Sequence, residues 1–316
     1  MTTPDVKVCH TPLWKATLLI PALFALVVAT PLAAQRATTF TIPDTVGVLI
    51  VAHGAAAGWN VRVDSLAATV RSGGRIRGPV EVSFLMGPAA ATHRFQDAIA
   101  ELARRGARRV AVVPLLESSH SGHYEQIRYL AGIVDALDTT MMHHLHMSGI
   151  TRPTTQVALE VTAGLDDAPE LAHALAARAL ALAPNPRGRA LLLLGHGPNT
   201  AEDYAAWMAN LRPVADSVKA ATGFASVLVE LVRDDAPAPV RAEAVTRTRE
   251  LIALQRAATG QDVAVVPVLV SSGSVSMGKL PADLAGLPVV YSGEPLLPHA
   301  ALALWVVRRV AEAIVP

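Results

Sequence analysis

The chain contains one stretch twice, and this internal duplication constrains its fold more than any other feature. Residues 110–119 and 263–272 are identical at eight of ten positions. Upstream of each copy lies an apolar run that ends in His-Gly, at His53-Gly54 and at His196-Gly197. The two His-Gly pairs are 143 residues apart and the two repeated stretches 153. A period of nearly half the chain predicts two similar halves, with functional residues where their strands end.

The first 35 residues resemble a targeting segment rather than part of a fold. Lys7 and Lys15 precede an apolar run over residues 16–29, and small residues follow it up to Gln35. This order of charged, apolar and small residues is typical of a secretory signal peptide. The run is short for a membrane span. We therefore expect an exported, periplasmic protein that has no membrane contact after cleavage; the alternative is an uncleaved anchor.

Composition narrows the classes of partner and of metal site. Cys9, the only cysteine, lies in the signal segment, so the mature chain should form neither disulfides nor thiolate metal sites. The 27 Lys and Arg residues nearly balance the 26 Asp and Glu residues, which argues against a nucleic-acid partner. We expect a signal peptide over residues 1–35, linkers over 36–45 and 184–190, and domains over 46–183 and 191–316.

Apolar runs alternate with helical spacings along both halves, which predicts an α/β fold with parallel sheets. Strands are expected over residues 46–52, 80–86, 110–116 and 141–147, and over 191–194, 227–232, 263–270 and 287–291. Helices are expected over residues 124–133, 156–163, 168–183, 240–257 and 300–314, and around residues 59–70, 95–102 and 207–218. Loops after the strands should line a cleft if the two halves face each other.

Three histidines follow buried strands of the first half. His53 ends the first expected strand, and His120 and His123 come shortly after the third. Imidazoles from two neighbouring strand ends could hold a divalent metal such as cobalt, nickel, iron or zinc. The alternative is that these rings only form hydrogen bonds in loops. An arginine does not precede His53, so a histidine phosphatase site is not indicated.

The second half repeats the first histidine but not the others. His196 corresponds to His53, and Val275 stands about where a second histidine of that copy would lie. We therefore expect the first half to hold the metal and the second half to shape the pocket.

Residues 141–147 have an unusual composition of three methionines, three histidines and one leucine. On a strand, His144 and His146 would point to one face and His143 to the other. These three histidines form a possible accessory metal site. The alternative is a strand whose histidines contact loops or solvent. Glu81 and Glu117 are possible carboxylate helpers that could accept protons or bind metal.

These motifs together resemble the class II tetrapyrrole chelatases, and above all the sirohydrochlorin cobalt- and ferrochelatase family. The resemblance covers residues 46–316 and depends on His53-Gly54, on the Pro-Leu-Leu-x-Ser-Ser stretch before His120, and on the second copy. It implies two flavodoxin-like domains that face each other across a cleft, where a tetrapyrrole with acidic side chains binds. It places the two catalytic, metal-binding histidines on His53 and His120, with His123 as the alternative to His120.

The resemblance implies an enzyme that inserts cobalt or iron, with nickel as a third option, into a sirohydrochlorin-type ring. The divalent ion is then a substrate, and no organic cofactor is expected. The alternative function is a periplasmic carrier that binds metal or tetrapyrrole without turnover. The histidines and methionines of residues 141–147 favour the carrier, and the pair of His53 and His120 favours the enzyme.

Overall fold

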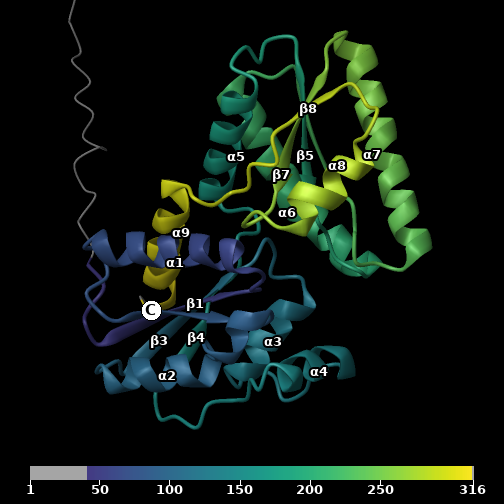
Figure 1. The fold of residues 1–316 in the computed structure, drawn as a ribbon. Helices are drawn as coiled ribbons and strands as arrows, with labels where there is room; N and C mark the ends of the chain where they lie inside the picture. The colour runs from purple at the N-terminus through teal and green to yellow at the C-terminus, as the bar shows by residue number, and fades with distance from the viewer. Residues whose placement is uncertain (1–40, 315–316) are drawn as a thin grey trace, which may run out of the picture. The chain divides into compact units, whose positions relative to one another are not determined.

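The computed structural model describes residues 41–314, so the expected signal segment and Cys9 lie outside it. Within these residues the chain forms two four-stranded sheets, in which every strand pair is parallel. The strand orders are β2-β1-β3-β4 and β6-β5-β7-β8 (Figure 1). The predicted α/β class with two parallel sheets is confirmed.

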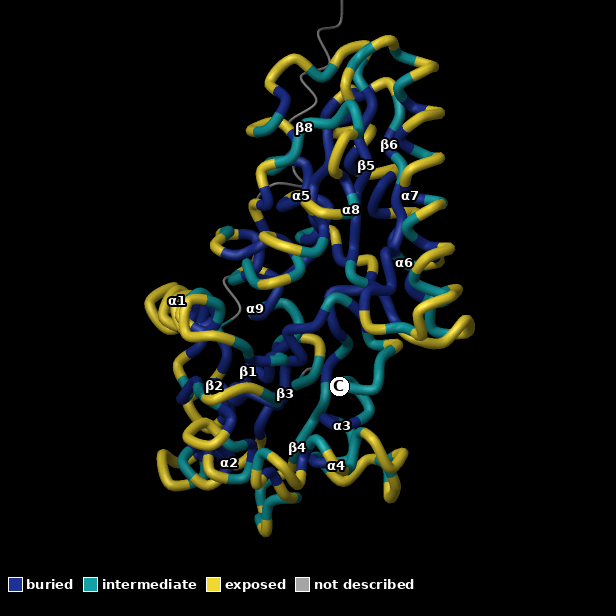
Figure 2. The backbone as a smooth tube through the Cα atoms, turned by 45° about the vertical axis from the view of Figure 1, so that its right-hand side comes forward, coloured by how far each residue is buried: buried dark blue, intermediate teal, exposed yellow. Residues whose placement is uncertain are grey.

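The central strands of both sheets are buried because parallel sheets are covered on both faces, whereas the edge strands β4 and β8 are partly exposed. All seven residues of β1 are buried, and Figure 2 shows β1, β3 and β5 in dark blue. The first sheet consists of β1 (Val46–Ala52), β2 (Val80–Phe84), β3 (Arg109–Leu115) and β4 (Ala158–Val161). The second consists of β5 (Ala190–Gly195), β6 (Ser226–Leu231), β7 (Val263–Val268) and β8 (Val289–Tyr291).

Helices follow the strands in both halves. In the first half these are α1 (Ala57–Ser72), η1 (Pro88–Ala91), α2 (Phe95–Arg104), α3 (Gly122–Leu130), α4 (Thr139–Met147) and α5 (Pro169–Leu182). In the second half they are α6 (Ala201–Thr222), α7 (Ala238–Thr259), the π-helical turn η2 (Val275–Lys279), α8 (Leu280–Asp283) and α9 (Ala300–Ile314). None of the helices within residues 41–314 combines the length and apolarity that a membrane span requires.

Two expected elements of the first half are wrong. Residues 141–147 belong to helix α4 rather than to a strand, because Asp138 caps the helix by accepting hydrogen bonds from the backbone N–H groups of Thr140 and Met141. Residues 156–163 contain strand β4 rather than a helix. β4 pairs with β3 at the edge of the sheet, so it is the fourth strand that the sequence placed too early.

The last helix of each half packs on the sheet of the other half. Helix α5 contacts α6 and β7, whereas α9 contacts α1 and β3. Figure 1 shows α9, in yellow, beside α1. Trp305 of α9 is fully buried in this packing, and Arg308 forms an ion pair of 2.7 Å with Glu170 of α5. The expected domain bounds stay a prediction. This exchange of helices joins the described residues, 41–314, into one compact unit.

Candidate functional site

A cavity of about 450 Å³ lies at the carboxyl ends of the central strands of both sheets. His53 and Glu117 follow β1 and β3, while His196 and Val270 follow β5 and β7, and all four line the cavity. This is where parallel α/β sheets bind ligands, because loops after adjacent strands diverge there. The ionisable side chains in the lining are His53, Glu117, His123, Asp138, His196, Asp203 and Asp235.

Glycine is required at both His-Gly pairs. Gly54 and Gly197 have φ angles of 85° and 83°, in the left-handed region. A Cβ atom on Gly54 would lie 2.3 Å from the backbone oxygen of Met86, and one on Gly197 would lie 2.7 Å from the Cβ atom of Leu231. The glycines therefore let the chain turn sharply and place each histidine at the cavity.

His53 and His123 are adjacent in the cavity. Their ring centroids are 4.6 Å apart, and the rings meet edge to face at 80°. His123 lies in the first turn of α3, which Ser121 caps by accepting a hydrogen bond of 3.2 Å from the N–H group of Tyr124. The loop after β3 thus ends where His123 can reach the ring of His53.

Hydrogen bonds determine which nitrogen of each ring carries the proton and which is free to bind a ligand. His53 Nδ1 lies 2.8 Å from the carbonyl oxygen of Gly54, which can only accept a hydrogen bond. His123 Nδ1 lies 2.8 Å from Gln126 Oε1, and Gln126 Nε2 donates to the carbonyl oxygen of Met141 at 2.7 Å. Both Nδ1 atoms therefore carry the proton, and both Nε2 atoms keep a lone pair for a metal ion.

The surroundings also keep these two rings uncharged. Burial lowers the pKa of His53, although its hydrogen bond to Gly54 opposes the shift. Burial, with the nearby ring of His53, lowers the pKa of His123 to about 4. Since only the neutral imidazole binds metal, both rings are ready to act as ligands at neutral pH.

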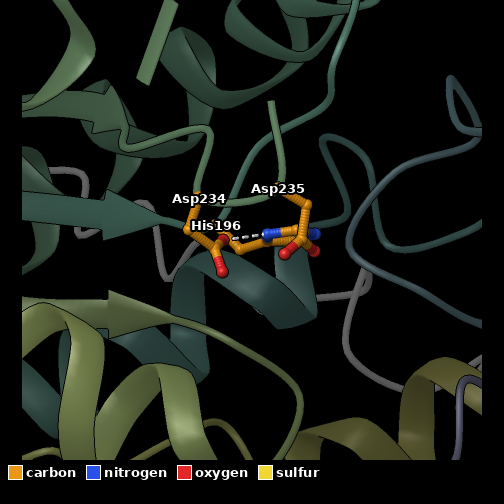
Figure 3. A group of neighbouring side chains, drawn as sticks. All are labelled: His196, Asp234 and Asp235. Atoms are coloured by element: carbon orange, nitrogen blue, oxygen red, sulfur yellow. Dashed lines mark hydrogen bonds and ion pairs between the residues drawn. The ribbon is translucent and has the colours of Figure 1, made fainter. Parts of the chain in front are cut away.

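The second half contributes His196, whose surroundings favour the charged form of the ring. His196 Nδ1 donates to Asp234, whose carboxylate is fully buried (Figure 3). Lys279 Nζ donates to Asp234 Oδ2 at 2.6 Å and to Asp235 Oδ1 at 3.2 Å. Burial raises the pKa of Asp234, but the hydrogen bonds from His196 and Lys279 outweigh it and lower the pKa to about 2. Burial lowers the pKa of His196, but Asp234 outweighs it and raises the pKa.

A strained turn places Asp234 beside His196. Arg233 has a φ of 51°, which is uncommon for a residue other than glycine. Its N–H group donates to the carbonyl oxygen of His196 at 2.6 Å, and its guanidinium donates to the carbonyl oxygens of Pro198 and Asn199. The buried Arg233 side chain thus ties the loop after β6 to the loop after β5.

His120 does not lie beside His53, where the sequence analysis expected a second metal-binding histidine. Its side chain is exposed and does not line the cavity, and its carbonyl oxygen accepts a hydrogen bond of 2.5 Å from Trp207 Nε1. The reason is that α3 begins only after Ser121, so His120 lies before the first helical turn and His123 within it. The alternative choice, His123, is the histidine that meets His53.

The possible accessory site is also not assembled as expected. Because successive residues of a helix point about 100° apart, α4 separates His144 from His146. The His144 ring stacks on His123 with centroids 6.5 Å apart, whereas His143 and His146 are exposed.

The two expected carboxylate helpers, Glu81 and Glu117, differ in position. Glu117 lines the cavity and accepts a hydrogen bond from the Val270 N–H group, but Glu81 pairs with Arg105 outside it.

Four residues around the site were not identified in the sequence analysis, namely Gln126, Asp234, Asp235 and Lys279. Asp234 and Asp235 follow the second strand of the second half, so the rule that ligands gather at strand ends could have indicated them. Gln126 and Lys279 come from helical segments, and only the folded chain shows that they meet the histidines.

Comparison with known proteins shows a family similarity for part of the chain. Residues 47–182 match the family model CbiX. A comparison with curated protein sequences gave no match.

Three solved structures are similar in fold. SirB from Bacillus subtilis with Fe3+ shares 16% identity at a TM-score of 0.58, over 85% of this chain and 95% of that one. DR2241 from Deinococcus radiodurans is a multi-domain protein with structural similarity to chelatases. It shares 21% identity at a TM-score of 0.54, and the match covers 85% of this chain and 55% of DR2241. CbiX, described as the terminal enzyme of siroheme biosynthesis in denitrifying bacteria, shares 17% identity at a TM-score of 0.50. This match covers 85% of this chain and 100% of the CbiX chain. Residues 47–182 are therefore similar to the CbiX family, and the solved structures show that the chain shares its fold with these proteins.

Proposed function

We propose that the protein inserts a divalent metal ion into a tetrapyrrole of the sirohydrochlorin type. The observation that supports this function most strongly is the pair of Nε2 lone pairs of His53 and His123 in one cavity. The family match and the names of the similar structures, a chelatase-like protein and a siroheme enzyme among them, point to the same reaction.

Two neutral imidazoles suit an ion that must be passed on. A closed site of four protein ligands holds zinc permanently, whereas two ligands leave positions open for water or ring nitrogens. During insertion the ion exchanges its bonds to His53 and His123 for bonds to the ring nitrogens. Two pyrrole N–H bonds break, and the carboxylate of Glu117, which lines the cavity, can accept the protons and pass them to solvent.

Cobalt and iron are the proposed metal substrates, with nickel as a third option, because imidazole nitrogen suits all three. SirB contains Fe3+ in its solved structure, which is compatible with iron here.

We further propose that the reaction takes place in the periplasm, because residues 1–35 resemble a signal peptide. Cell fractionation with and without these residues tests the location: only the complete chain should be recovered from the periplasm.

An absorption assay tests the function and the choice of histidine together. Purified protein is mixed with sirohydrochlorin and Co²⁺, and the spectrum of the ring is followed. We expect His123→Ala to lower the insertion rate more than about a hundredfold, because it removes one of two ligands. His120→Ala is the matched control and should keep most of the rate, since His120 is exposed. Equal losses in the two variants would overturn the assignment.

The charge of the cavity supports the second candidate function, a carrier without turnover. The described lining residues include Glu117, Asp138, Asp203 and Asp235, but no Lys or Arg. Such a lining attracts a cation and repels the carboxylates of an acidic ring. In the same assay a carrier would bind Co²⁺ tightly, yet show no insertion rate above the uncatalysed background.

A further inference from the structure

A second group of potential metal ligands lies in the same cavity as the histidine pair. One ligand atom each from His196, Asp234 and Asp235 lies within 4.8 Å of the others. Figure 3 shows the carboxylate of Asp234 joined to the imidazole of His196, with Asp235 beside them. His196 and Asp235 line the cavity, so the group is accessible to an ion that enters it. Nitrogen and carboxylate oxygen together suit borderline divalent cations.

The structure already holds a positive charge at this place. The ammonium group of Lys279 bridges Asp234 Oδ2 and Asp235 Oδ1, at 2.6 Å and 3.2 Å. The side chain of Asp234 is fully buried, and a buried carboxylate needs a cationic partner. The Lys279 side chain is 40% exposed and lies on the short turn η2, so it can withdraw into solvent. A divalent ion could then take its place between the same two oxygens.

We propose that His196, Asp234 and Asp235 form a second divalent-cation site, which Lys279 occupies when no ion is bound. The ion is a borderline cation such as Co²⁺, which this site receives from solvent close to His53 and His123. Lys279 competes with the ion for both carboxylates and so keeps binding reversible. The site binds the ion without any ring and does not depend on the proposed insertion activity.

Equilibrium dialysis of the purified protein against Co²⁺ tests this proposal through the number of ions bound. We expect two ions per chain for the unchanged protein. The variant His53→Ala/His123→Ala should keep the second-half ion, and Asp235→Asn should keep the first-half ion. Asp235 is a suitable position because its side chain is 62% exposed, so the substitution should leave the fold intact. One ion that Asp235→Asn does not affect would overturn the proposal.

The substitution Lys279→Met distinguishes a cation site from a merely structural ion pair. Removing the competing ammonium should tighten Co²⁺ binding at the second site by about tenfold, because the ion then no longer has to displace a positive charge from the two carboxylates. The matched control is Lys219→Met, which removes the other lysine of the described residues at the far end of α6. Unchanged or weaker binding in Lys279→Met would show that no ion replaces the ammonium group. Because no ring is present, these outcomes are independent of the insertion assay.

Discussion

At the residue scale, hydrogen bonds decide what each imidazole can do. Gly54 and Gln126 accept the Nδ1 protons of His53 and His123, and these rings stay neutral. Asp234 accepts from His196 and favours its charged form instead. Without a bound ion, the same residue type is therefore neutral in one half and favours its charged form in the other.

Gln126 should control metal binding although it does not line the cavity. Its amide fixes the tautomer of His123 and joins α3 to the backbone of α4. We expect Gln126→Ala to weaken Co²⁺ binding at the His53–His123 pair by about tenfold to a hundredfold, as is usual for groups that orient a metal ligand. Calorimetric titration in the Asp235→Asn background measures this pair alone. Glu125→Ala, one position away, is the control and should change the affinity little.

The pH dependence of that affinity follows from the lowered pKa values. A lowered histidine pKa keeps the ring neutral to a more acidic pH, so protons compete with the metal only as the pH approaches about 4 for His123. We expect the Co²⁺ affinity of the pair in Asp235→Asn to persist to a more acidic pH than a pair of imidazoles with the ordinary pKa of about 6.5 would allow. An affinity that already falls about tenfold per unit below about pH 6.5 would mean ordinary, solvated imidazoles.

At the element scale, the sequence predicted the buried strands well and the edge of the first sheet poorly. The run over residues 46–52 is apolar throughout and rich in the β-branched residues valine and isoleucine, as expected of a strand that is buried on both faces. Residues 141–147 have no such constraint. Their N-cap, Asp138, was the missed helix signal, and the alternation of Val157, Leu159 and Val161 was the missed sign of β4.

Helix α9 should stabilise the first half although it ends the second. Trp305 is fully buried where α9 packs on α1 and β3. We expect Trp305→Ala to lower the free energy of unfolding by about 3–5 kcal/mol, the usual cost of removing a buried aromatic ring. Urea denaturation measures this loss. The neighbouring Leu304 is 51% exposed, so Leu304→Ala should cost no more than about 0.5 kcal/mol. Similar losses in both variants would contradict the packing described here.

At the scale of the whole molecule, the site depends on contacts between the two halves. Trp207 Nε1 donates to the carbonyl oxygen of His120, and the Val270 N–H group donates to Glu117 Oε1 at 3.0 Å. Sequence could predict the two halves and His53, because strand ends follow from local patterns. It could not choose between His120 and His123, or find Lys279, because those positions depend on where helices begin and how the halves meet.

The central claim is that His53 and His123 hold one exchangeable ion between them. Diffraction from crystals soaked in Co²⁺, recorded at the cobalt absorption edge, tests it most directly. The account predicts an anomalous peak within coordination distance of Nε2 of both rings, at about 2.0–2.2 Å from each. A cobalt peak on His120 or His146 with none between His53 and His123 would contradict it.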